Sequence, residues 1–230
     1  MDATSEYLSD YVSRLTYEDL SPQAVQQVKR TVIDSLGCAA GAFDAEPAAI
    51  ARGLASRVKG KPSARILGTR QTTSADLAAF ANTVLVRYLD CNDTYAARGT
   101  GHPSDMISAV LAVADAQRNG GRAAITAIVA AYEAFCRMAD QIALKGWDQG
   151  MFASIGAACG AGKILGLDRA SLAHAISIAI TTVRALGRDA DRRALDVEGL
   201  RDGGGGPDGT VRGRAGGGRH DGPRRPVRRP

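Results

Sequence analysis

The chain has 230 residues, 45% of them hydrophobic, and a formal net charge of +5, which allows one large domain or two small ones with enough apolar side chains for a core. It contains no run of about eighteen uncharged apolar residues and no basic, apolar leader, so we predict neither a membrane span nor a secretory signal. The four cysteines are scattered and form no CxxC motif or Cys/His cluster, so we expect free thiols in a reducing cytoplasm and no bound metal.

Six segments show the apolar spacing of helices. They are residues 21–43, 74–90, 103–121, 121–144, 151–166 and 168–183. The first begins with Ser21 as N-cap and Pro22 at the first helical position, and the third begins at Pro103. The last two are rich in Ala and Gly, which lets helices pack closely. Residues 63–69 suit a short strand or an extended link. We therefore predict an all-α, helical bundle-like domain of at least six helices over residues 1–183.

The composition changes at about residue 184. Residues 184–230 hold 12 Arg, no Lys and seven acidic residues, which accounts for the whole net charge of +5. Too few apolar side chains remain to offset the entropy of ordering, so we predict a disordered, low-complexity tail. Arg/Gly-rich segments can bind nucleic acid, but this one has no Phe or Tyr on which bases could stack. We expect no nucleic-acid partner, and we keep a helical scaffold with a basic nucleic-acid-binding tail as an alternative.

Two further features have ordinary explanations. The stretch GAACGAGKILG resembles a phosphate-binding loop, but Ala157 stands where the first Gly is required and Ile164 where a hydroxyl is required. His174 lies on an otherwise apolar helical segment, where we expect a core or helix-face side chain rather than a ligand. We assign no site to either.

The segment LDCNDTYAARGTGHPSD, between the second and third predicted helices, carries the candidate chemistry. Asp93, Thr94 and Ser104 suit caps and turns, but this explanation fits His102 less well. The alternative is an acid–base site, which needs a carboxylate, a group with a pKa near neutral and a hydroxyl that orients the substrate. A metal site of Asp90, Asp93 and His102 would need a fourth ligand from elsewhere. Spacing alone leaves these alternatives open.

Four stretches resemble the MmgE/PrpD family, whose best-known members are 2-methylcitrate dehydratase and cis-aconitate decarboxylase. They are YEDLSPQAVQQVKRTVIDSLGCAAGAF, AAFANTVLVRYLDCNDTYAARGTGHPSD, GWDQGMFASIGAACGAGKILGLD and AHAISIAITTV. The second is the most specific, because family members carry LDFxDT followed by HPS, with Cys91 here at the position of the Phe. The resemblance implies an all-helical first domain, a smaller α+β second domain and a homodimer. It also implies a lyase of propionate catabolism that acts on a small tricarboxylate without metal or cofactor.

The resemblance makes Asp90, Thr94 and His102 the catalytic residues. His102 and Asp90 would form the acid–base pair of a dehydration, and Thr94 would orient the substrate. The residues expected to bind substrate are Asp93, Ser104, Asp148 and Gln149. Asp93 also suits a structural role. Many family members have a histidine where this chain has Gln149, so the substrate, and dehydration against decarboxylation, stay open.

The family also supplies a lysine from a WKG-type segment soon after the last predicted helix, and no such segment follows here. One permitted set of codons for residues 189–202, read one nucleotide later, encodes Thr-Arg-Thr-Gly-Ala-Leu-Ser-Met-Trp-Lys-Gly-Cys-Ala, which is family-like. The final HDGPRRPVRRP behaves in the same way with the same offset. We therefore hypothesise a frameshift between about Val183 and Asp189, which would leave a truncated, inactive fragment with an out-of-frame tail.

Overall fold

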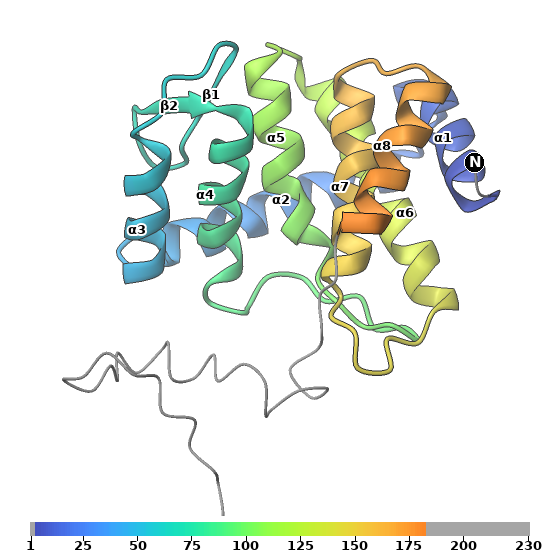
Figure 1. The fold of residues 1–230 in the computed structure, drawn as a ribbon. Coiled ribbons are helices and arrows are strands. Elements are labelled where there is room, and N and C mark those ends of the chain that lie inside the picture. Colours follow the sequence, from blue (N-terminus) through green and yellow to red (C-terminus); the bar gives the residue numbers. More distant parts are fainter. Residues whose placement is uncertain (1–2, 183–230) are drawn as a thin grey trace, which may run out of the picture. The chain divides into compact units, whose positions relative to one another are not determined.

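A computed structural model describes residues 3–182, which form eight α-helices, two 3₁₀ helices and one two-stranded hairpin (Figure 1). The α-helices are α1 (Ala3–Arg14), α2 (Pro22–Gly41), α3 (Glu46–Ala55), α4 (Ala75–Arg87), α5 (Ile107–Ala116), α6 (Gly121–Gln141), α7 (Gly150–Ile164) and α8 (Arg169–Thr182). The 3₁₀ helices are η1 (Tyr17–Asp19) and η2 (Pro103–Met106), and the antiparallel strands are β1 (Ser63–Arg65) and β2 (Thr72–Ser74). The all-α prediction is confirmed for these residues, and the predicted disordered tail lies outside them.

All six predicted helices are present, and α1 and α3 are two helices that the prediction lacks. The predicted cap of α2 is confirmed, because the Ser21 side chain accepts a hydrogen bond from the Ala24 amide. The segment predicted as one helix over 103–121 begins instead as η2 and ends at Ala116. A reason for the early end is Arg118, which has a φ of 55° and so leaves the right-handed helical region.

The main hydrophobic core lies between α1, α5, α6, α7 and α8. Phe135 of α6 and Phe152 of α7 meet edge to face, with their ring centroids 5.6 Å apart. Gly156 of α7 allows a close approach to α6, because a methyl group there would lie 2.7 Å from the Ala131 carbonyl oxygen. The small residues expected to permit tight helix packing therefore do so at this contact.

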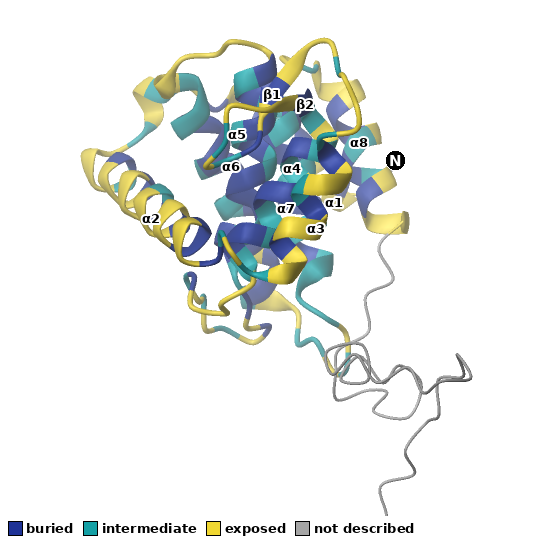
Figure 2. Ribbon diagram, turned by 90° about the vertical axis from the view of Figure 1, so that its left-hand side faces the viewer, coloured by how far each residue is buried: buried dark blue, intermediate teal, exposed yellow. Residues whose placement is uncertain are grey.

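The helices lie side by side, and α2 crosses behind them (Figure 1). Figure 2 shows that α2 is exposed along its outer side, whereas much of α4 and α7 is buried. The loop that follows α4 and the loop between α6 and α7 come together at one end of the helices (Figure 1). Within residues 3–182, no helix has both the length and the apolar character that a membrane crossing requires.

Candidate active site

The loop between α4 and η2 is held in a fixed shape against α6 and α7. Tyr95 and Gly101 pair in an antiparallel bridge, with N–H···O distances of 2.8 and 3.1 Å. The Gly99 amide donates to the Ala139 carbonyl oxygen of α6 at 2.8 Å. A methyl group on Gly101 would lie 2.6 Å from Cβ of Gln149, so only glycine fits against the facing loop. The residues between and beside these anchors are therefore placed by the fold as well as by their own sequence.

The structure brings the three predicted catalytic residues together. His102 Nε2 lies 3.8 Å from Asp90 Oδ1, and His102 Nδ1 lies 3.5 Å from Thr94 Oγ1. Asp90 has a φ of 53°, in the left-handed region that Asp tolerates better than most residues, and this turns the chain after α4. Asp90 and Thr94 are exposed, while the His102 side chain is 19% exposed. The cluster is therefore open to solvent on the Asp90 side and anchored on the histidine side.

The His102 ring has a defined orientation. Its Nδ1 lies 2.7 Å from the backbone carbonyl oxygen of Asp93. A carbonyl oxygen can only accept, so Nδ1 carries a proton and donates it. In the neutral ring, Nε2 then holds the free lone pair, and Nε2 is the nitrogen next to Asp90. This arrangement suits a base whose protonated form is stabilised by a neighbouring carboxylate.

Asp93 is held through both of its carboxylate oxygens. The Ser104 amide donates to Oδ1 at 2.9 Å, and the Tyr132 hydroxyl of α6 donates to Oδ2 at 2.8 Å. Burial and the Asp93 charge raise the pKa of Tyr132, so its hydroxyl keeps its proton and remains a donor. Ser104 is fully buried, and its hydroxyl accepts from the Asn92 side chain at 2.8 Å. These bonds fix the carbonyl that orients His102, and substrate binding by Asp93 or Ser104 stays a prediction.

Gln149 connects the facing loop to the histidine. Its Oε1 accepts from the His102 amide at 3.3 Å, and its Nε2 donates to Asp105 Oδ2 at 2.9 Å. Asp105 also accepts from Asn92 at 2.9 Å and lies 3.6 Å from Nε of Arg87. Burial raises the pKa of Asp105 despite these favourable partners. Gln149, which stands where many family members have a histidine, thus supports the backbone of His102 through a half-buried hydrogen-bond network.

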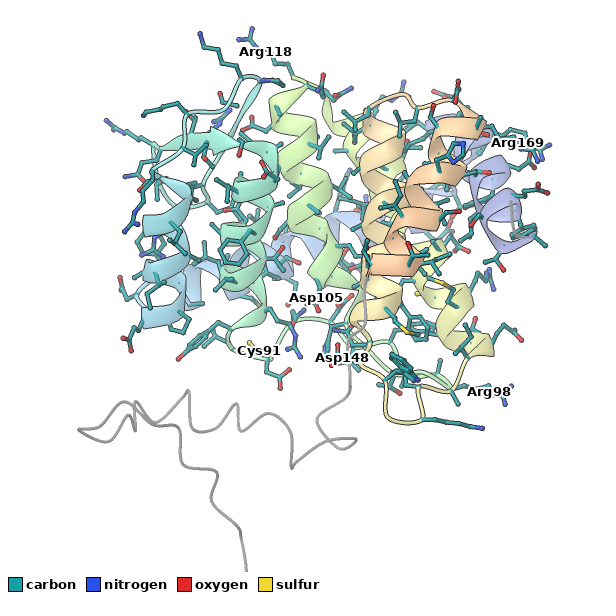
Figure 3. The ribbon with its side chains drawn as sticks, in the orientation of Figure 1. Cys91, Arg98, Asp105, Arg118, Asp148 and Arg169 are labelled. Atoms are coloured by element: carbon teal, nitrogen blue, oxygen red, sulfur yellow. The ribbon has the colours of Figure 1, made fainter. Side chains whose placement is uncertain are left out.

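Asp148 takes a different place from the other predicted residues. Its Oδ1 accepts from the Gly150 amide at 2.7 Å, next to the start of α7. Figure 3 shows Cys91, Asp105 and Asp148 at the same end of the helices, with Arg118 and Arg169 at the opposite end. Asp148 therefore lies at the same end of the helices as the candidate site, but its hydrogen bond is to a residue only two positions away. Its role toward substrate stays a prediction.

Sequence analysis missed four residues of this network: Arg87, Asn92, Asp105 and Tyr132. Arg87 forms an ion pair with Asp90 and also approaches Asp105. Asp105 directly follows the HPS motif, so its position in the sequence could have marked it as part of the site. Tyr132 is 39 positions from Asp93 on another helix, and no local pattern marks it.

The surface near the hairpin carries no comparable group of side chains. A shallow depression near the hairpin is lined by Ser63, Arg65, Thr72, Asp115, Arg118 and Asn119. Asp115 there accepts from the Arg65 amide at 2.8 Å, which joins α5 to β1, and the lining has no histidine or cysteine. Across residues 3–182, no group of three or more His, Cys, Asp or Glu side chains is placed to hold a metal ion. A reaction without metal or cofactor remains a prediction.

Residues 6–194 match the profile of the MmgE/PrpD N-terminal domain. The chain belongs to the MmgE/PrpD family. Among its relatives, the 2-methylcitrate dehydratases of Cupriavidus necator, Salmonella typhi and Escherichia coli strain K12 are 33%, 31% and 30% identical to it over 185 residues. These matches cover 74% of this chain and 37% or 38% of each relative. This MmgE/PrpD chain therefore spans little more than a third of the length of those relatives, and its candidate site lies inside the matched residues.

Proposed function

We propose that this chain carries part of the active site of a lyase that dehydrates a small tricarboxylate similar to 2-methylcitrate. The observation that supports it most is the Asp90–His102 pair, 3.8 Å apart, with the proton-bearing Nδ1 of His102 directed at the Asp93 carbonyl. The substrate class is taken from the curated relatives, which are named 2-methylcitrate dehydratase. The cytoplasmic location, the role in propionate catabolism and the homodimer are parts of the same proposal.

Dehydration removes a proton from the carbon beside a carboxylate and a hydroxyl group from the neighbouring carbon. His102 Nε2 takes the proton, and the C–H electron pair forms the double bond as the C–O bond breaks. The leaving hydroxide takes the proton back from the imidazolium and departs as water. In this scheme Asp90, the second member of the predicted acid–base pair, acts by stabilising the imidazolium and not by transferring a proton itself, and Thr94 orients the substrate hydroxyl. Acid–base work of this kind contributes about 10²–10⁴-fold to a rate.

The substrate carboxylates need positive charge near this pair. Arg87 contacts both Asp90 and Asp105, and its side chain is 34% exposed. We place one substrate carboxylate at Arg87, because a guanidinium can bind a carboxylate through two parallel hydrogen bonds. Asp148 and Gln149 on the facing loop are the proposed contacts for the rest of the molecule.

The test is a turnover assay with 2-methylcitrate and with cis-aconitate, using protein in which the family reading frame is intact. Dehydration is followed by the absorbance of the new double bond, and decarboxylation by release of CO₂. His102→Asn is expected to lower the dehydration rate about 10²–10⁴-fold. His174→Asn, at an exposed position on α8, is the matched control and is expected to change nothing. CO₂ release from cis-aconitate would assign the decarboxylase instead, and turnover of neither compound would overturn the proposal.

The frameshift between about Val183 and Asp189 is also proposed, and it falls on residues outside those described. It is supported by the family-like reading of the tail in the next frame, whereas the match to the family's N-terminal domain continues past this point to residue 194. The present chain would then be inactive, and the frame-restored protein active. Sequencing the locus decides it: a single intact frame with incompatible codons removes the hypothesis.

The alternative of a helical scaffold with a nucleic-acid-binding tail has a separate test. Filter binding is measured for the full chain and for a chain ending at residue 183, over a range of salt concentrations. We expect no tail-dependent binding. Binding that weakens steeply with salt and is lost on truncation would favour the scaffold.

A further inference from the structure

Cys38 and Cys91 form a close thiol pair beside the candidate active site. Cys38 Sγ lies 3.8 Å from Cys91 Sγ. Cys38 is near the end of α2, and Cys91 directly follows Asp90 in the loop after α4. The two residues are 53 positions apart in sequence, so the packing of α2 against this loop brings them together. A disulfide needs the sulfur atoms about 2.0 Å apart, which is less than 2 Å of further approach.

The backbone on both sides of the pair is packed. Ala42, just beyond α2, lies in a buried cluster with Leu85 and Val86 of α4. A methyl group on Gly41 would lie 3.0 Å from Cδ1 of Leu89, so the end of α2 is in contact with the segment that leads to Cys91. These contacts keep the two thiols near each other without a covalent bond.

The two thiols differ in exposure. Cys91 is exposed, whereas Cys38 is 7% exposed. Burial and the neighbouring Cys91 raise the pKa of Cys38 to about 11, so Cys38 is protonated at neutral pH. A dissolved oxidant therefore reaches Cys91 first, and Cys38 is placed to react second.

We propose that Cys38 and Cys91 are a redox-active dithiol that a peroxide converts to a disulfide linking α2 to the segment that carries Asp90. The Cys91 thiolate attacks one peroxide oxygen, the O–O bond breaks, and the leaving hydroxide takes up the thiol proton as water. Cys91 is then a sulfenic acid. Cys38 Sγ attacks that sulfur, the S–O bond breaks, and the oxygen leaves as a second water with the Cys38 proton. Two thiols are oxidised, and one hydrogen peroxide is reduced by two electrons.

The test uses the full chain, reduced and then treated with hydrogen peroxide. Remaining thiols are alkylated, and the protein is digested and analysed by mass spectrometry without reductant. Before alkylation, we expect the whole-chain mass to be lower by two hydrogen atoms, and after digestion we expect a linked peptide pair that contains Cys38 and Cys91. Cys91→Ser is expected to lose the linked pair, whereas Cys136→Ser, at a half-buried position on α6, is expected to keep it.

The melting temperature and the pH dependence of the reaction provide two further tests of the disulfide. The oxidised chain is expected to melt on the order of 5 °C above the reduced chain, because the cross-link restricts the unfolded state. Dithiothreitol reverses this shift, and Cys91→Ser does not show it. Closure of the disulfide is expected to accelerate as the pH rises toward the Cys38 pKa of about 11, because the thiolate is the nucleophile.

Three outcomes overturn the proposal. They are oxidation of Cys91 to the sulfinic acid with Cys38 still free, a disulfide between two chains, and a linked pair that involves Cys136 or Cys159. No substrate is present in these measurements, so their result is independent of the proposed lyase activity.

Discussion

The loop that carries the candidate site depends on two carboxylates with half-buried partners. Asp93 accepts from the Tyr132 hydroxyl and the Ser104 amide, and Asp105 accepts from Gln149. Removing one donor leaves a desolvated acceptor without its partner, which costs about 1–3 kcal/mol and exceeds the net contribution of an ordinary hydrogen bond. Stability measurements can therefore test the position of this loop without any assay of turnover.

Tyr132→Phe removes the hydroxyl that donates to Asp93 and keeps the ring. We expect it to lower the free energy of unfolding by about 1–3 kcal/mol, measured by urea denaturation followed by circular dichroism. Tyr7→Phe is the control, because Tyr7 is 72% exposed and an exposed change of this kind has an effect within about 0.5 kcal/mol. Equal stability of the two variants would show that the hydroxyl does not support the loop.

Asp105 gives the pH dependence of stability a defined sign. Its pKa is raised by burial in the folded state, so the folded chain binds this proton more tightly than the unfolded chain does. The stabilisation is full below the unfolded pKa and is lost as the pH rises through the folded pKa. We therefore expect the melting temperature of the wild type, relative to that of Asp105→Asn, to fall as the pH is raised above about 4, the ordinary pKa of an aspartate, and then to level off. A constant difference across this range would contradict the assignment.

At the residue scale, the sequence allowed prediction of the segment but not of its partners. Asp90, Thr94 and His102 lie in one short motif that the resemblance to the family singled out, where spacing alone left alternatives open, and the structure places the three side chains together. The supports of this motif come from elsewhere: Tyr132 is 39 positions from Asp93, and Gln149 is 47 positions from His102. Such contacts depend on how α6 and α7 pack against the loop, which no local pattern contains.

At the scale of elements, apolar spacing predicted six of the eight α-helices within residues 3–182 and missed α1 and α3. α1 is rich in polar residues and buries Leu8 and Val12 along one side only. α3 buries three alanines, which carry a weak periodic signal. The helix predicted over 103–121 also ends earlier than predicted, because Arg118 adopts a positive φ that an arginine does not signal in the sequence. Helices of this kind become stable through their packing partners, so their own sequence is a poor guide.

Replacing a helical glycine by alanine is expected to have opposite effects on stability at two positions. Gly160 of α7 faces α5 and α6, where a methyl group would lie 2.6 Å from Val110 Cγ2 and 3.0 Å from the Ala127 carbonyl oxygen. Gly37 of α2 has nothing within 4 Å of the same position. We expect Gly160→Ala to destabilise the chain by about 1–3 kcal/mol through overpacking.

Gly37→Ala is expected to stabilise it by about 0.5–1 kcal/mol, because Ala loses less conformational entropy in a helix than Gly. Both values are measured by chemical denaturation under the same conditions. Stabilisation by Gly160→Ala would mean that α6 and α7 are further apart than described.

At the scale of the whole molecule, the first and last described helices close the bundle. α1 packs against α8 and α7, and the Ser5 and Ser177 hydroxyls of α1 and α8 lie 3.2 Å apart. Leu172 and Ile176 of α8 are fully buried in the core that also contains Val12 of α1. The domain boundary near residue 183 stays a prediction, and it keeps α8, which contributes to this core, inside the domain.

This closure leads to a prediction about the domain boundary. A chain of residues 1–183 is expected to unfold in one cooperative transition at the same temperature as the full chain. A chain of residues 1–168, which lacks α8, loses the burial of Leu172 and Ile176, worth about 3–6 kcal/mol at roughly 1.5–3 kcal/mol for each side chain. That loss is comparable with the whole stability of many domains, about 5–15 kcal/mol, and it also exposes the faces of α1 and α7 that α8 covers. We expect the 1–168 chain to be unfolded or aggregated, as seen by circular dichroism and analytical ultracentrifugation. Melting of the 1–183 chain several degrees below the full chain would instead place residues 184–230 within the folded unit.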